Sequence, residues 1–366
     1  MKSKKIWCAV SGHGYGHWSQ MVPVLHMLLA ARPDLTLHVT GSIPTALIQR
    51  TLRHPVTHDL RSCDVCLIQP DPMQVDLAAT AAAMRLFHDD WPERVAREAA
   101  LMAAWQPDLI LGNIPCLPME AGKRLGIPTV ALTSLTWDEV ITAYFPPDAP
   151  EIAAWLATMR NAYAQATLAL RITPALPDHP FPESRIIPAI TTSGIERATE
   201  LRHALGIAPH DTRPLVLLTL GGIPTRSFPL ARLNTQRDFH WILDQPLEPD
   251  SASHLHALDQ LPTWPFADLL ASVDALISKP GYGMACSAMA HRIPFLYLRR
   301  GIFPDEPPIL EWCAQHGRVM EIRREAFQQG QFSAPLTTLL AQPAPPAPEV
   351  NGAEVAARML MERFLE

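Results

Sequence analysis

Two histidines in a glycine-rich stretch near the start of the chain are the residues best suited to chemistry. Residues 11–17 read S-G-H-G-Y-G-H, so glycines alternate with His13 and precede His17 directly. Histidine accepts a proton near neutral pH, which makes a loop histidine a candidate general base. Glycines at this density indicate a backbone that adopts positive φ or lets a ligand approach closely. The alternative is that both imidazoles only hydrogen-bond the turn.

The residues on either side indicate how this stretch is positioned. An apolar run, residues 6–10, precedes it, and a run with helical spacing, residues 17–31, follows it. A strand, a loop and a helix in this order present backbone N–H groups and a helix N-terminus to a ligand. The glycines at 12, 14 and 16 do not have the G-x-G-x-x-G spacing of dinucleotide-binding loops, and no Gly-Lys-Ser/Thr of a P-loop is present.

Composition limits the class of protein. The chain has 366 residues, enough for two domains, with 48% hydrophobic and 18% charged residues. Its net charge of −6, without a long basic run, argues against nucleic acid as a partner. The first apolar stretch is broken by Gly12 and His13, too early for a signal peptide or a membrane span. We therefore expect a cytoplasmic protein without a transmembrane segment, and its oligomeric state stays open.

The six cysteines do not indicate a disulfide framework or a metal site. They are scattered from position 8 to position 313. Cys63 and Cys66 have the C-x-x-C spacing, but no second pair completes a tetrahedral zinc site. We interpret them as reduced structural thiols and expect no bound metal.

The first half of the chain alternates between strand and helix patterns. We expect strands near 35–40, 63–70, 108–112 and 129–133, and helices near 44–52, 74–105, 118–125 and 150–166. Such alternation predicts right-handed crossovers and a parallel sheet whose ligands bind beyond the carboxyl ends of the strands. The loops 11–17, 112–115 and 133–138 should therefore converge on one crevice.

A proline-rich segment, 174–188, interrupts the pattern, and the α/β alternation then restarts. Strands are expected near 215–220, 239–243, 274–279 and 295–298, a helix at 284–291, and a last helix at 354–364 after a Pro/Ala linker. This organisation predicts an N-terminal domain, 1–180, a C-terminal domain, 181–345, and a C-terminal helix, 346–366, that packs on the N-terminal domain.

Five dispersed stretches together resemble a known family. They are 11–17, N-I-P at 113–115, T-W-D at 136–138, K-P-G-Y-G at 279–283, and 300–306. In this order they resemble the bacterial glycosyltransferase-like proteins that begin with G-H-G-F-G-H, whose module is also similar to the N-terminal part of plant arabinokinases. The resemblance implies an α/β protein of the GT-B fold, with two Rossmann-like domains whose parallel sheets face a cleft.

On the N-terminal side, the resemblance implies an acceptor site. His17 matches the position where related enzymes place a histidine against the acceptor hydroxyl, which needs a base to become a nucleophile. Asp138 would orient that histidine or hold the acceptor, although it could instead be a helix N-cap. His13, Gly14 and Gly16 would line the same site.

On the C-terminal side, the resemblance implies a nucleotide-sugar site, with the nucleotide-sugar as co-substrate and no other cofactor. Backbone amides near the glycines would face the leaving diphosphate without a metal. The residues implied in donor binding are Gly221, Gly222, Lys279, Gly281, Tyr282, Gly283, Ser287, Arg300, Asp305 and Glu306. Several have plainer alternatives. Lys279 could be a solvated strand end, Tyr282 a packing residue, and Glu306 a loop residue that contacts nothing.

Two departures from the family pattern keep alternatives open. Asn113 is neutral where the family usually has an acid, and Ser287 stands where a glutamate commonly binds the nucleotide ribose. The first hypothesis is a metal-independent glycosyltransferase that moves a sugar from a nucleotide-diphosphate donor to an unknown acceptor hydroxyl. The alternatives are a nucleotide-sugar epimerase or hydrolase on the same fold, and a non-catalytic nucleotide-sugar binding protein.

Overall fold

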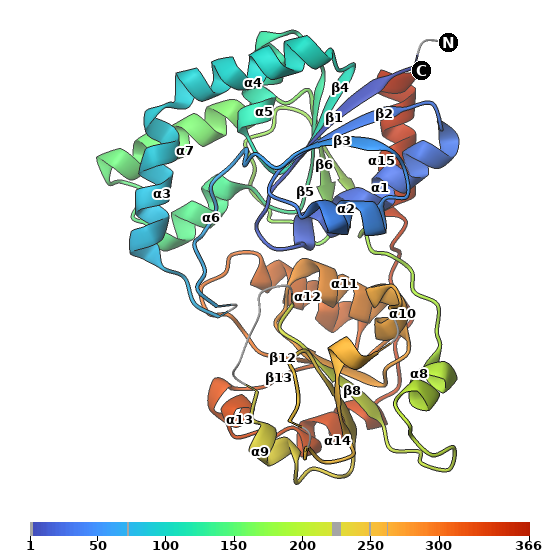
Figure 1. Ribbon diagram of the computed structural model, residues 1–366. Helices are drawn as coiled ribbons and strands as arrows, with labels where there is room; N and C mark the ends of the chain where they lie inside the picture. The colour runs from blue at the N-terminus through green and yellow to red at the C-terminus, as the bar shows by residue number, and fades with distance from the viewer. Residues whose placement is uncertain (1–2, 72, 222–227, 249, 262) are drawn as a thin grey trace.

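Two parallel β-sheets, one in each half of the chain, form the framework of the molecule (Figure 1). The computed structural model describes residues 3–71, 73–221, 228–248, 250–261 and 263–366. The N-terminal sheet has seven strands in the order β3-β2-β1-β4-β5-β6-β7, and the C-terminal sheet has six in the order β10-β9-β8-β11-β12-β13. This is the α/β class with two parallel sheets that the sequence predicts.

The elements of the N-terminal half alternate as expected. Its strands are β1 (Lys5–Val10), β2 (Thr36–Thr40), β3 (Val56–Asp59), β4 (Leu109–Asn113), β5 (Thr129–Thr133), β6 (Leu168–Ile172) and β7 (Ser184–Ile187). Its helices are α1 (Gly16–Ala31), α2 (Thr45–Thr51), α3 (Leu77–Asp89), α4 (Trp91–Trp105), α5 (Leu117–Arg124), α6 (Trp137–Tyr144) and α7 (Pro150–Tyr163).

The C-terminal half repeats this organisation. Its strands are β8 (Leu215–Leu218), β9 (His240–Leu243), β10 (Leu255–Ala257), β11 (Ala275–Ser278), β12 (Phe295–Tyr297) and β13 (Val319–Glu321). Its helices are α8 (Ala198–Ala204), α9 (Leu230–Leu233), α10 (Phe266–Ala271), α11 (Tyr282–Ala290), α12 (Glu306–His316), α13 (Arg324–Gln328) and α14 (Ser333–Ala341), and α15 (Gly352–Leu360) follows.

Apolar strands form because both faces of each sheet are covered. The strand β1 is buried from Ile6 to Val10, and β4 is buried over its whole length. One hydrophobic cluster joins α1 and α15 to one face of each sheet, so apolar packing continues from one domain to the other. Burial on both faces is typical of parallel sheets.

The structure corrects two of the predicted boundaries. No strand forms over 63–70, and the third strand is instead β3. The N-terminal sheet extends beyond residue 180, where the sequence places the domain boundary, because β7 pairs with β6. The proline-rich residues 174–182 are thus a loop inside the N-terminal domain.

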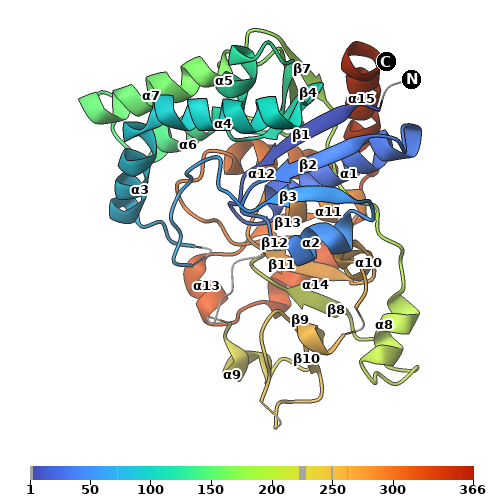
Figure 2. The same cartoon turned by 45° about the horizontal axis from the view of Figure 1, so that its top comes forward.

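The last helix lies on the N-terminal domain. In both views α15 runs beside α1 (Figures 1 and 2), and its apolar face belongs to the same core. Arg32 at the end of α1 donates to the carbonyl oxygen of Leu365 at 3.0 Å. The chain therefore crosses from the N-terminal domain to the C-terminal domain and back, and the two crossing segments meet in a β-bridge between Ile190 and Asn351.

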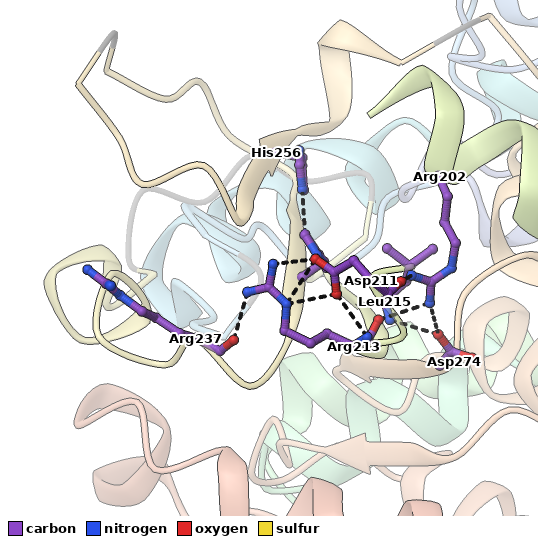
Figure 3. A network of polar contacts seen from close by, with 8 residues as sticks. Arg202, Asp211, Arg213, Leu215, Arg237, His256 and Asp274 are labelled. Atoms are coloured by element: carbon purple, nitrogen blue, oxygen red, sulfur yellow. Dashed lines mark hydrogen bonds and ion pairs between the residues drawn. The ribbon is translucent and has the colours of Figure 1, made fainter. Parts of the chain in front are cut away.

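A polar network ties together the amino ends of the C-terminal strands (Figure 3). His240 contacts Asp211 Oδ2 at 2.9 Å through Nε2 and His256 Nε2 at 3.1 Å through Nδ1. Asp274 accepts from the backbone N–H of Leu215 at 2.7 Å and from Arg202 at 3.3 Å. These contacts stabilise the sheet at the amino ends of its strands, opposite their carboxyl ends.

Among the helices of the described residues, none is long and apolar enough to cross a membrane.

Candidate functional site

The glycine-rich loop places His17 in the first turn of α1, at the carboxyl end of β1. Gly14 has φ of +68°, a conformation that L side chains rarely adopt, so the turn requires glycine there. An added Cβ at Gly14 or at Gly16 would meet no atom within 4 Å. The loop between the two histidines therefore borders open space.

A chain of hydrogen bonds fixes the protonation of His17. Its Nδ1 lies 2.9 Å from Asn113 Oδ1, Asn113 Nδ2 donates to Gln20 Oε1 at 2.8 Å, and Gln20 Nε2 donates to Ser134 Oγ at 3.2 Å. Because the Asn113 oxygen can only accept, His17 Nδ1 must carry the proton. Burial lowers the pKa of His17, so the ring is neutral with an unprotonated Nε2.

His13 lies close to His17 and shares a wall with it. The indole of Trp137 packs edge-on against both imidazoles, with ring centroids 5.4 Å from His13 and 5.6 Å from His17. Burial, followed by the charges of His17, Lys279 and Arg300, lowers the pKa of His13 to about 3. His13 is thus a neutral side chain that faces cationic groups of the C-terminal domain.

Asp64 is a site residue that the sequence reasoning missed. It is buried, and its Oδ2 accepts from Trp137 Nε1 at 2.7 Å. Burial raises its pKa, while hydrogen bonds from Ser11 and Trp137 and the charge of His17 act in the opposite direction. A lone acid between Cys63 and Cys66 in an apolar stretch was the available signal, but the pattern there was interpreted as a strand.

Asp138 does not orient His17 in this structure. Its Oδ2 pairs with Arg160 Nε at 2.9 Å, and its Oδ1 is buried with no hydrogen-bond partner among the described residues. It is not the N-cap of α6 either, because Thr136 holds that position in a capping box with Glu139. Asp138 lines a groove together with Glu139 and Arg160, and acceptor binding stays a prediction for it.

Lys279 lies between two glycine turns at the carboxyl ends of β8 and β11. A Cβ added at Gly221 or at Gly281 would lie 3.9 Å from Lys279 Nζ. Gly221 has φ of +85°, which favours glycine. Burial and the charge of Arg300 lower the pKa of Lys279 to about 8, although Asp305 and Glu306 oppose the shift. Gly222 lies outside the described residues.

Arg300, Asp305 and Glu306 form one ion-pair cluster. Arg300 Nε donates to Glu306 Oε1 at 2.7 Å, and its terminal nitrogen donates to Asp305 Oδ1 at 2.8 Å. Glu306 is fully buried in the first turn of α12, so it is not a loop residue without contacts. The guanidinium also lies 3.7 Å from the ring centroid of Phe303. The two carboxylates hold the arginine in a fixed place.

Three of the predicted donor residues make contacts between domains or within the linker. Tyr282 is buried, and its hydroxyl donates to Thr173 O at 2.9 Å and accepts from Ile190 N at 3.0 Å. This is the packing role left open by the sequence. A Cβ at Gly283 would lie 3.3 Å from Ser19 Oγ of α1. Ser287 Oγ lies 2.6 Å from the hydroxyl of Thr191 in the linker.

The fold therefore brings two groups of opposite character together across the domains. On the N-terminal side lie neutral imidazoles, an indole and the buried Asp64. On the C-terminal side lie Lys279, Arg300 and the N-terminus of α11, whose first turn contains no acid. Within the described part of the chain, no group of three or more His, Cys, Asp or Glu is arranged to hold a metal ion.

Comparisons with known proteins agree with this architecture. No family model matches the chain. L-arabinokinase from Arabidopsis thaliana is 23% identical over 361 residues, which are 96% of this chain and 34% of the relative. The chain thus spans about a third of the length of this curated relative, in keeping with the predicted resemblance to arabinokinases.

Solved structures of glycosyltransferases superpose on the whole chain. The glycotransferase of kitacinnamycin has a TM-score of 0.68 and 15% identity, covering 100% of both chains. The glycosyltransferase VinC, solved in complex with dTDP, has a TM-score of 0.59 and 18% identity, covering 98% of this chain and 96% of its own. These likenesses confirm the GT-B fold that the sequence predicts.

Proposed function

We propose that the protein is a glycosyltransferase that moves a sugar from a nucleotide-diphosphate donor to an acceptor hydroxyl in the cleft. The observation that carries this proposal is the state of His17. Its Nδ1 is committed to Asn113, and its unprotonated Nε2 has no hydrogen-bond partner among the described residues. A neutral imidazole in this tautomer is suited to accept a proton from a hydroxyl.

In the proposed reaction the acceptor oxygen attacks the anomeric carbon while the bond from that carbon to the diphosphate oxygen breaks. The hydroxyl proton moves to His17 Nε2, which produces an imidazolium. The charge of Asp64 favours this imidazolium, as it raises the pKa of His17. Asp64 is in this account a positioning residue, because it acts through Trp137 and through its field rather than on the substrate.

On the donor side, the proposal assigns the leaving diphosphate to the cationic group. Lys279 and the N-terminus of α11 supply positive charge and N–H donors, which stabilise a developing phosphate anion. Arg300 lies beside them, with its charge balanced by Asp305 and Glu306. These groups can do this without a metal ion, which supports the metal-independent form of the proposal. VinC, a structural neighbour, was solved with dTDP.

A non-catalytic nucleotide-sugar binding protein is the second candidate. It is motivated by the loss of two acids, because Asn113 and Ser287 are neutral where the family usually has carboxylates. An epimerase or hydrolase on the same fold would need acids acting on the sugar. Turnover distinguishes these candidates, since only transfer depends on an added acceptor.

The test uses UDP-, GDP-, dTDP- and CMP-sugars with the full chain. Thermal shift identifies the nucleotide, and nucleotide release is then measured with and without cell extract as the acceptor source. We expect one nucleotide to stabilise the protein and extract to accelerate release. His17→Ala should reduce release by about 10²- to 10⁴-fold while nucleotide binding persists.

His26→Ala is the matched control, because His26 lies exposed on the same helix. Release that is unchanged in His17→Ala would refute the base assignment. No stabilisation by any nucleotide or nucleotide-sugar would refute the proposed function itself.

A further inference from the structure

A groove of about 880 Å³ is lined by residues of both domains. Its N-terminal wall comes from α6, α7 and the loop 175–180, and its C-terminal wall comes from the start of α12. Asp138 in this wall directly follows Trp137, whose ring packs on His13 and His17. The groove therefore begins one residue from the indole that packs against the proposed base.

One buried carboxylate in the groove has unused hydrogen-bonding capacity. Asp138 is 3% exposed, and its Oδ2 pairs with Arg160. Its Oδ1 is buried and accepts no hydrogen bond within the described ranges of the chain. A buried charged oxygen without a donor costs free energy, so this position favours a ligand that donates there.

The charges of the groove are mostly negative. Four acids line it, namely Asp138 and Glu139 from α6, Asp178 from the loop and Glu311 from α12. Arg160 is the cation of the lining set, and it is paired with Asp138. Burial raises the pKa of Glu139 to about 7, so Glu139 is only partly ionised at neutral pH, and it lowers the pKa of His179, so the histidine adds no charge. The net negative charge therefore comes mainly from Asp178 and Glu311.

This acidity contrasts with the cationic group to which the proposed function assigns the leaving diphosphate. An acidic lining repels phosphate and carboxylate groups, and it attracts ammonium groups. Leu176, Pro177 and Pro307 provide apolar surface between the charges, which suits the carbon skeleton of a ring. The groove is therefore unsuited to the anionic donor and to an anionic acceptor.

We propose that this groove is the acceptor subsite, and that it selects acceptors carrying a protonated amine, with Asp138 accepting the ammonium N–H. The inference rests on the proposed function and adds to it the chemical class of the acceptor. A hydroxyl on the same molecule then lies on the Trp137 side, toward His17.

Three monosaccharides that have the same ring but different charges test the charge preference. Glucosamine, glucose and glucuronate present a cation, a neutral group and an anion, and their binding to the full chain is followed by ligand-observed NMR at pH 7 and low salt. We expect glucosamine to bind tighter than glucose, and glucuronate to bind weakest. Added salt should reduce the difference, because the attraction is electrostatic.

The double variant Asp178→Asn with Glu311→Gln removes two exposed charges from the rim. It should reduce the preference for glucosamine over glucuronate by about 2- to 5-fold, as expected for exposed charges. The matched control, Asp259→Asn with Glu362→Gln, changes the same net charge at exposed positions outside the groove and should keep the preference.

Equal binding of the three sugars, no binding of any, tightest binding of glucuronate, or an unchanged preference in the rim variant would each overturn the inference. Thermal shift measured with nucleotides on the same samples distinguishes failure of this inference from failure of the proposed function. A chain that binds a nucleotide but shows no amine preference loses only the inference. A chain that binds no nucleotide loses the proposed function.

Discussion

At the scale of single residues, Asn113 decides which nitrogen of His17 carries the proton. A carboxylate in this position would pair with the imidazolium and hold the proton more tightly. The neutral amide still orients the ring, because Asn113 is itself fixed by Gln20 and Ser134. His17 consequently stays unprotonated to lower pH than a histidine paired with an acid.

The substitution Asn113→Asp tests this role of the amide. We expect the new carboxylate to raise the pKa of His17 and to move the acidic limb of the kcat/KM profile upward by about 1–2 pH units. In the unchanged protein the limb should lie below pH 6.5, because burial lowers the pKa of His17 from that value. A limb in the same place in both proteins would contradict the assignment.

Removal of the buried charge at Asp64 should have the opposite effect. Asp64→Asn keeps the size of the side chain and an acceptor for Trp137 Nε1, while the field that favours protonated His17 is lost. We expect kcat to fall about tenfold, equivalent to about one pKa unit, and the acidic limb to shift to lower pH. A fall in kcat with an unmoved limb would indicate a structural role only.

The site was partly predictable from the residues. The motifs that contain His17, Lys279 and Arg300 resemble those of a family, and the fold gathers these residues across the domains. Asp64 was missed because its partners, Ser11 and Trp137, are distant in sequence, and pairing over such distances leaves no local pattern. Tyr282 was misleading because a buried hydroxyl and a ligand-binding hydroxyl look alike in sequence.

At the scale of elements, α11 connects the two domains through its first residue. The hydroxyl of Tyr282 donates a hydrogen bond to Thr173 O, which follows β6, and accepts one from Ile190 N, which follows β7. Gly283 lets α11 approach Ser19 of α1 closely. The proposed phosphate-binding helix is therefore attached to the N-terminal domain by the same turn to which the proposal assigns the donor.

Loss of the Tyr282 hydroxyl should destabilise this connection. Tyr282→Phe leaves two buried backbone groups without a partner, which should lower the free energy of unfolding by about 1–3 kcal/mol. Urea titrations measure the change. Tyr297→Phe is the control, because the Tyr297 hydroxyl makes no hydrogen bond within the described residues. Equal changes in both variants would contradict the proposed contribution of the hydroxyl.

Strands inside the sheets were more predictable than strands at their edges. The interior strands β1, β4, β5, β8 and β11 follow from apolar runs, because they are buried on both faces. The four edge strands, β3, β7, β10 and β13, were all missed. Edge strands are short and often partly exposed, so they lack a continuous apolar run. The interior β6 was missed as well, because it follows α7 closely.

At the scale of the whole molecule, the histidines whose pKa is lowered by burial outnumber the acids whose pKa is raised by burial. Burial lowers the pKa of seven histidines, namely His13, His17, His38, His88, His179, His240 and His256. Burial raises the pKa of three carboxyl groups, namely Asp64, Glu98 and Glu139. The histidines lie in both domains, so their effect is not confined to the site.

The protein should accordingly lose stability in mild acid. A histidine whose pKa is about 4 when folded and 6.5 when unfolded binds fewer protons in the folded state between these values. The contribution of such a histidine to the free energy of unfolding is complete above pH 6.5 and is lost as the pH falls. The carboxyl groups whose pKa values are raised have the opposite effect. Urea midpoints should therefore decrease from pH 7 to pH 4.5.

His88→Gln provides the check on this origin, because His88 has a pKa of about 4 and lies outside the site. The variant should show a shallower dependence of stability on pH. An identical dependence would assign the effect to other groups.

The β-bridge between Ile190 and Asn351 has a mechanical consequence. The C-terminal domain is joined to the rest of the chain by two covalent connections, and this bridge holds them together. We expect relative motion of the two domains to be a rotation about this bridge, resisted by the packing of α11 on α1 and by the hydrogen bonds of Tyr282 to Thr173 and Ile190.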